Sequence, residues 1–145
     1  MLDSLLICNT SGLPFYSRKF SPSSKLGDDP SLLSGLISAI DSIGRMMFNR
    51  KVGIINYVEE ESRPNEADSH VVIMSKDLFS EDKHINFVFF VFGECDMSEL
   101  RQVSTSIFIE IKQFLRQSNP EFDKIESNVN HILDTQFAEL IAQSN

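Results

Sequence analysis

The stretch at residues 85–92 constrains the fold more than any other part of the chain. It reads Ile-Asn-Phe-Val-Phe-Phe-Val-Phe, an apolar run broken by one asparagine. A short apolar run rich in aromatic and β-branched residues is typical of a strand buried on both faces, whereas a half-solvated strand alternates apolar and polar residues. Such a strand needs a layer of structure on each side. We therefore expect residues 85–92 to form the central strand of a sheet that helices cover on both faces.

Hydrophobic periodicity and turn residues predict the other elements. Residues 2–9 and 13–20 are expected to form a hairpin, and Pro14 indicates that its second strand lies at an edge of the sheet, because proline cannot donate to a strand ladder. Two more strands are expected at residues 51–59 and 70–74. Helices are expected from Pro30 to about Phe48, after Asp96, and from Pro120 to about Ile141. The predicted element order is ββαβββαα.

The first predicted helix carries an apolar face and a polar face. At 100° per residue, seven apolar residues share one side and six polar or charged residues share the other. The apolar set is Leu32, Leu33, Leu36, Ile37, Ile40, Ile43 and Met47; the polar set is Ser31, Ser34, Ser38, Asp41, Ser42 and Arg45. We expect the apolar set to pack on the sheet and the polar set to face water.

Length and charge limit the class of protein. A chain of 145 residues fits one domain, which we place at residues 1–145. Its net charge of -8 would repel nucleic acid and an anionic membrane, so we expect no nucleic-acid partner and only indirect membrane association. Two cysteines, no basic start before an apolar leader and no stretch of roughly 20 apolar residues favour a cytoplasmic protein.

The sequence shows no signature of catalysis or of cofactor binding. The three histidines are far apart, the cysteines are not paired as Cys-x-x-Cys, and no glycine-rich phosphate loop or nucleophile elbow occurs. An acidic stretch around residues 59–68 does not match a calcium loop, and such stretches are usually solvated. We expect no catalytic residues, no metal and no cofactor, and we do not expect an enzyme.

The order ββαβββαα, with the Asn-Thr-Ser-Gly turn after the first strand, resembles the longin domain. The resemblance covers essentially the whole chain and implies an α/β sandwich. It has a five-stranded antiparallel sheet in the order 2-1-5-4-3, with one helix on one face and two on the other. The roadblock fold is the nearest competitor, but its sheet is normally preceded by a helix, and here a strand comes first. We expect a stand-alone domain, because neither a SNARE helix nor a membrane anchor follows the last predicted helix.

The longin resemblance also implies a binding surface. In longins a peptide segment or a small GTPase is commonly held between the first helix and the third strand, or at an exposed sheet edge. In this chain that region contains Met46, Phe48, Ile55 and Tyr57. Phe48 lies off the helix's apolar stripe, and Ile55 follows another isoleucine, so both faces of a predicted edge strand are apolar. An exposed apolar edge favours pairing with another chain.

We therefore expect a non-enzymatic longin-like scaffold whose partner is a small GTPase or a subunit of a membrane-trafficking assembly. Two alternatives stay open. One is a roadblock-like GTPase-regulating module that forms a homodimer. The other is a sensory domain of the PAS or GAF type, which would enclose a small ligand and should contain a sizeable internal pocket.

Overall fold

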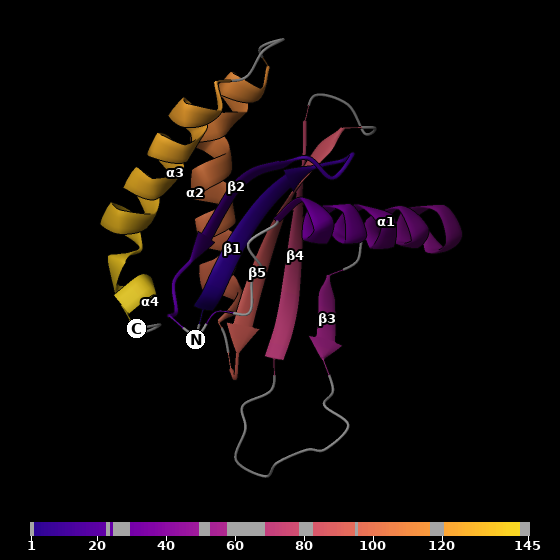
Figure 1. Cartoon of the computed structure of the whole chain (residues 1–145), viewed down its shortest axis with the longest axis horizontal. Coiled ribbons are helices and arrows are strands. Elements are labelled where there is room, and N and C mark those ends of the chain that lie inside the picture. Colours follow the sequence, from indigo (N-terminus) through magenta and orange to yellow (C-terminus); the bar gives the residue numbers. More distant parts are fainter. Residues whose placement is uncertain are drawn as a thin grey trace.

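In the part of the chain that it describes, the computed structural model has five strands and four helices around one sheet (Figure 1). It describes residues 2–22, 24, 30–49, 53–57, 69–78, 83–94, 96–116 and 121–142. The strands are β1 (Leu2–Asn9), β2 (Pro14–Lys19), β3 (Ile54–Tyr57), β4 (Ser69–Asp77) and β5 (His84–Phe92). The helices are α1 (Pro30–Phe48), α2 (Met97–Leu115), α3 (Phe122–Gln136) and α4 (Ala138–Ala142).

The strands lie in the order β2-β1-β5-β4-β3, and each pairs antiparallel with its neighbours. β5 is the middle strand of the sheet, and its side chains alternate between the two apolar layers. Phe87 and Phe89 are fully buried towards one layer, and Val88 is fully buried towards the other. The two outer strands of the sheet are β2, which begins at Pro14, and β3, which is described over Ile54–Tyr57.

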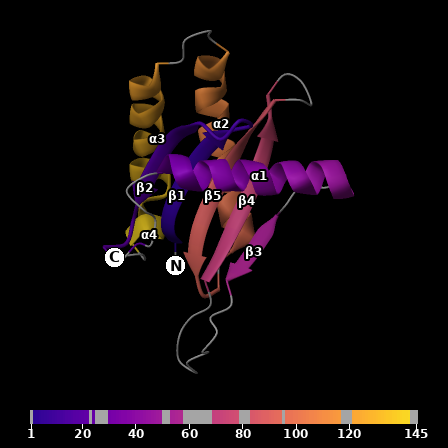
Figure 2. The ribbon, with the colours of Figure 1, turned by 45° about the vertical axis from the view of Figure 1, so that its right-hand side comes forward.

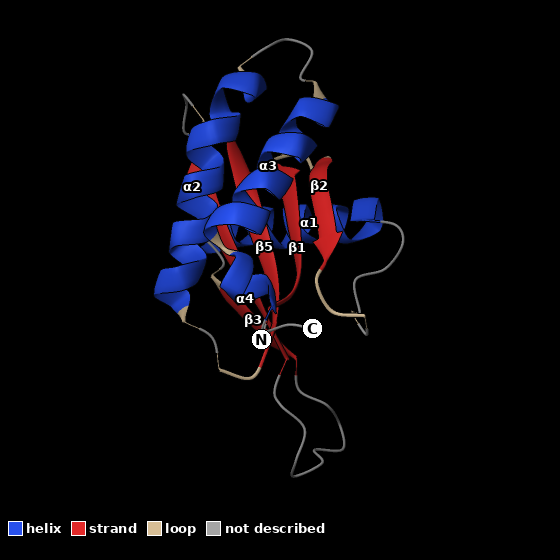
Figure 3. Cartoon of the chain, turned by 90° about the vertical axis from the view of Figure 1, so that its left-hand side faces the viewer, coloured by secondary structure: helices blue, strands red, loops and turns tan. Residues whose placement is uncertain are grey.

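The helices form one layer on each face of the sheet (Figures 2 and 3). α1 crosses one face, where Ile37 packs with Leu6 and Val88. α2, α3 and α4 cover the other face and share the larger apolar core with β1 and β5. The α2 helix begins as expected, because the Asp96 side chain accepts a hydrogen bond from the Ser98 amide at 2.9 Å.

The expected architecture of three helices, with two on the second face, is wrong at the C-terminus. The predicted third helix divides at Phe137, whose backbone (φ -122°, ψ 25°) leaves the helical region. The chain then forms α4, a separate short helix that buries Leu140 in the same core. The observed order is therefore ββαβββααα. Periodicity did not reveal this break because the apolar spacing continues across it.

Several strand bounds also differ from the predicted ones. β4 continues to Asp77, three residues beyond the expected end, because residues 75–77 pair with β5 and leave a shorter connection between the two strands. β3 is described over four residues, and residues 51, 52, 58 and 59 of the predicted strand lie outside the described part of the chain. The same holds for Pro120, where we expected the third helix to begin.

Candidate functional site

The face of α1 that meets the sheet is largely polar, the reverse of what periodicity predicts. The buried residues of α1 are Ser34, Ile37, Asp41 and Gly44. The expected core residues Leu32, Leu36, Ile43 and Met47 expose between 53% and 79% of their surface. Only Ile37 of the predicted stripe is fully buried, while Leu33 and Ile40 are half-buried. The prediction that the polar face lies in water is therefore wrong for Ser34 and Asp41.

Hydrogen bonds from serines explain why the polar face of α1 can be buried. Ser34 donates to the carbonyl of Gly12, and Ser38 donates to the carbonyl of Thr10 at 2.6 Å. Both acceptors belong to the turn between β1 and β2. Gly12 permits the contact, because a Cβ at this position would lie 3.1 Å from the Gly35 Cα. Its φ of +84° also lies in the left-handed region that favours glycine.

A buried imidazole–carboxylate contact completes the attachment of α1. His84 Nε2 lies 2.6 Å from Asp41 Oδ2, and both side chains are less than 5% exposed. Arg45 Nε donates to both Asp41 oxygens at 3.2 Å. On the sheet side, the Thr10 hydroxyl accepts from the His84 amide and donates to its carbonyl, each at 2.9 Å. The contact therefore joins α1, β5 and the β1–β2 turn.

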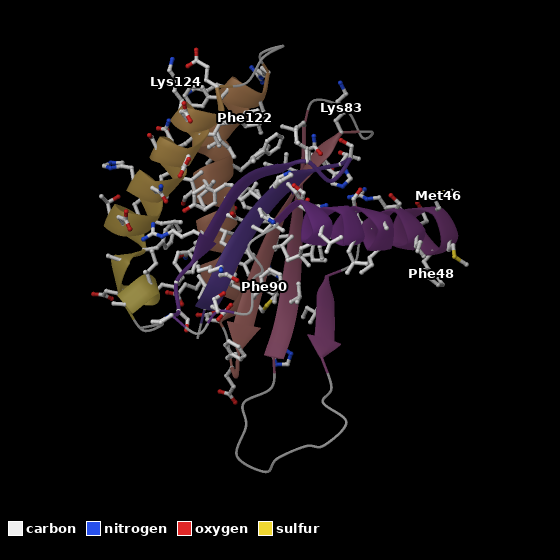
Figure 4. All side chains as sticks on the ribbon, viewed as in Figure 1. Met46, Phe48, Lys83, Phe90, Phe122 and Lys124 are labelled. Atoms are coloured by element: carbon white, nitrogen blue, oxygen red, sulfur yellow. The ribbon has the colours of Figure 1, made fainter. Side chains whose placement is uncertain are left out.

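Because its polar side is turned inward, α1 presents an apolar face to solvent. We call this face, together with the neighbouring β3, the α1–β3 surface. Its exposed members are Leu32, Leu36, Ile43, Met46 and Met47 on the outward side of α1, Phe48 at the C-terminal end of the helix, and Ile54 on β3. In Figure 1 the C-terminal part of α1 extends beyond β3, and Figure 4 shows Met46 and Phe48 at that projecting end. Monomeric domains seldom expose so many neighbouring large apolar residues without a partner.

The four predicted partner-binding residues lie on two elements that follow one another in the chain, α1 and β3. Met46 and Phe48 are 86% and 66% exposed at the end of α1. Ile55 and Tyr57 lie in β3, opposite Val71 and Ser69 of β4; their side chains are outside what the structure describes. β3 ends the strand order, and its other edge pairs with no strand among the described residues.

Sequence reasoning missed Leu32, Leu36, Ile43 and Met47 as surface residues because it assigned them to the core. One signal could have exposed the error. Ser34, Ser38 and Asp41 are spaced to share one helix face, and all three side chains can bond to a backbone turn or an imidazole. A helix with two usable faces does not reveal from periodicity alone which of them meets the sheet.

The remaining candidates for chemistry give no catalytic arrangement among the described residues. No group of three or more metal-ligating side chains occurs there. Burial, with a smaller effect from the Asp41 charge, raises the pKa of the Cys8 thiol to about 12, which makes it a poor nucleophile. No helix of the described chain is both long enough and apolar enough to span a bilayer.

One pocket of about 240 Å³ lies away from the α1–β3 surface. It is lined by Leu78 after β4, Lys83 before β5, and Leu115 and Arg116 at the end of α2. Figure 4 shows Lys83 near the connection between β4 and β5. Two cations beside two leucines are an ordinary surface arrangement, and we assign no function to this pocket.

Comparison with known proteins leaves the chain without a family assignment by sequence. No protein-family model matches it, and no curated protein matches it. Among solved structures, the gliding protein MglB from Thermus thermophilus is similar over 63% of this chain, with 8% identity and a TM-score of 0.41. The match spans 61% of the MglB chain, less than two thirds of it. The strand order and helix layers of the chain itself resemble those of a longin- or roadblock-like fold.

Proposed function

We propose that this chain is a non-enzymatic interaction domain that binds a protein partner through the α1–β3 surface. The partner we propose is a small GTPase or a subunit of a membrane-trafficking assembly, as the longin-like fold favours. The observation that carries the proposal is the outward-facing apolar side of α1. Six large apolar residues of α1, with Ile54 of the following strand β3, expose about half or more of their surface.

The charge of this surface favours a protein over a membrane or nucleic acid. Its seven members carry no charge, and the two charged residues of α1, Asp41 and Arg45, contact each other on the sheet side. An anionic bilayer or a phosphate backbone is held mainly by lysine and arginine. The α1–β3 surface supplies none, and the chain as a whole is acidic. An apolar protein patch with a polar rim suits it better.

The two elements offer two kinds of contact. The exposed side of α1 suits packing against an apolar helix or groove, whereas the outer edge of β3 offers backbone groups to an added strand. Ile55 and Tyr57 belong to this second contact, and Met46 and Phe48 to the first. We propose that all four take part in binding and that the protein acts in the cytoplasm, where such partners occur.

Affinity capture from lysate of the source cell tests the proposal. The bait is the wild-type chain or the Met46→Asp, Phe48→Asp variant, and the lysate is loaded with a non-hydrolysable GTP analogue or with GDP. Ile109→Asp is the matched control, because Ile109 is an aliphatic residue 56% exposed on α2, in the opposite layer. We expect a GTPase or trafficking subunit to be captured by wild type and the control and at least tenfold less by the double variant.

Two results would contradict the proposal. One is a partner retained equally by the double variant, since the α1–β3 surface would then not bind it. The other is a mass by light scattering that shows a stable dimer which the double variant disrupts, with no other protein captured. That second result would support the roadblock-like alternative, in which two copies cover each other's apolar faces.

A further inference from the structure

The orientation of α1 about its own axis conflicts with its hydrophobicity. At 100° per residue, the apolar residues of α1 are centred roughly 100° away from the residues that meet the sheet. Part of the sheet face below α1 is itself apolar: Leu6, Val71, Ile73 and Val88 are buried there, beside the buried polar residues His84 and Asn86. Turning α1 by about a quarter of a turn would place Leu36 and Ile40 over these residues. The same turn would carry Ser34 and Asp41 towards water.

We propose that α1 has two orientations on the sheet and that the Asp41–His84 contact selects the one that exposes the apolar face. In the second orientation, Leu33, Leu36, Ile40 and Met47 pack towards the sheet, and the α1–β3 surface loses most of its apolar area. This inference rests on the proposed function, since it describes how that binding surface is presented or withdrawn.

The contacts around Asp41 explain how one pair can hold the helix. Asp41 is the deepest charged residue of α1 and contacts both His84 and Arg45. Thr10 fixes the His84 backbone from the other side, so the imidazole has a set position. Arg45 Nη2 is buried and has no hydrogen-bond partner among the described residues, and this unfavourable burial would end if the helix turned this side towards water. When the contact between Asp41 and His84 is lost, burial of the apolar side chains of α1 against the sheet favours the second orientation.

Such an element has the properties of a molecular switch. Two packings of one helix against one sheet form discrete states, and a contact made in only one state shifts the population between them. A partner that binds the exposed apolar face stabilises the observed orientation. Any event that breaks the Asp41–His84 contact withdraws the face and weakens binding.

Methyl-labelled NMR with a soluble gadolinium chelate tests this directly, without a partner. Leu36 and Met46 are 53% and 86% exposed, so the chelate should broaden both methyl signals in the wild type. A quarter turn buries Leu36 but leaves Met46 in solvent. In Asp41→Asn and in His84→Gln, we expect the relaxation enhancement at Leu36 to fall at least twofold while that at Met46 is unchanged.

Two further variants keep the test decisive. Asp134→Asn removes a carboxylate that Arg18 contacts on α3, far from α1 in sequence and in the opposite layer, and should leave both signals as in the wild type. Adding Ile40→Ser to Asp41→Asn makes the alternative face polar at its centre, and should restore the enhancement at Leu36. Circular dichroism confirms that each variant is folded.

The outcomes separate this inference from the proposed function. If Leu36 stays exposed in the folded Asp41→Asn and His84→Gln variants, the switch is wrong, whatever the variants bind. If Leu36 becomes protected but capture of the partner is unchanged, then the switch exists but α1 does not form the binding surface, and the link to function is overturned. Protection of Leu36 together with loss of capture supports both.

Discussion

At the residue scale, Cys8 is the clearest case of a side chain controlled by its surroundings. Burial and the Asp41 charge raise its pKa to about 12 from an ordinary value of 9.0. The unfolded thiol therefore loses its proton at lower pH than the folded one, so the unfolded state binds fewer protons and stability falls as pH rises from 9 towards 12. Urea unfolding should show a loss of a few kcal/mol over this range.

The control for that measurement is Cys8→Ala. It removes the thiol, so the variant is less stable at pH 7 but should lose less stability between pH 9 and pH 10 than the wild type. Burial also raises the pKa of Tyr16, from 10.0 to about 12. Its ionisation lowers the stability of the wild type and of the variant equally at higher pH. Equal slopes for the two chains between pH 9 and 10 would show that Cys8 ionises as easily in the folded state as in the unfolded one.

Gly12 and Gly35 face each other across the contact between the β1–β2 turn and α1, and they should respond oppositely to alanine. Gly12→Ala requires a left-handed backbone and brings a Cβ to 3.1 Å from both the Gly35 Cα and the Ser34 carbonyl oxygen. We expect it to cost about 1–3 kcal/mol of unfolding free energy. The Cβ added by Gly35→Ala has no atom within 4 Å and lies inside a helix, so this variant should gain about 1 kcal/mol of unfolding free energy. Chemical denaturation of both variants checks the pair.

At the element scale, the sequence predicted an element's orientation correctly where only one orientation could be buried. It failed where either of two faces could pack on the sheet. β5 could be predicted because its residues are apolar on both faces, so no choice of orientation arises. The α2 face could be predicted because Leu100, Val103, Ile107 and Ile111 form a single buried stripe. The face of α1 that meets the sheet could not be predicted, since its polar residues find hydrogen-bond partners in the β1–β2 turn and in His84 of β5. Met46 and Phe48 are exposed at the end of α1, and their role in binding stays a prediction; the wider apolar face was not predicted.

A polar cluster joins α3 to the edge strand β2, and it allows a prediction at the same scale. The Tyr16 hydroxyl and Arg18 Nη1 both donate to Asn130 Oδ1, and Arg18 Nη2 contacts Asp134 at 2.9 Å. Asn130→Ala leaves the buried Tyr16 hydroxyl without its acceptor and should cost about 1–3 kcal/mol. Asp134→Ala, at a carboxylate 56% exposed, should cost less than about 1 kcal/mol. Thermal unfolding of the two variants would refute this if Asp134→Ala proved the more damaging.

At the scale of the whole molecule, the two faces of the sheet are held by different forces. Among the residues that the structure describes, the α2–α3–α4 side has a core of nineteen buried apolar residues. The α1 side has six and relies on the contacts of Ser34, Ser38 and Asp41. Local opening requires less free energy where fewer apolar contacts are broken. We therefore expect α1 to detach from the sheet well before the molecule unfolds.

Native-state hydrogen exchange measures this difference directly. Amides in the middle of α1 should exchange several-fold or more faster than those of β5 and α2, with little dependence on low denaturant concentrations, because the opening exposes little surface. A protein partner on the α1–β3 surface should slow exchange in α1 while leaving β5 unchanged, since it adds the apolar contacts that this side of the sheet lacks. If α1 in the free protein exchanges only through global unfolding, at the rate of β5, then the two sides are one cooperative unit and the polar attachment is as strong as the apolar core.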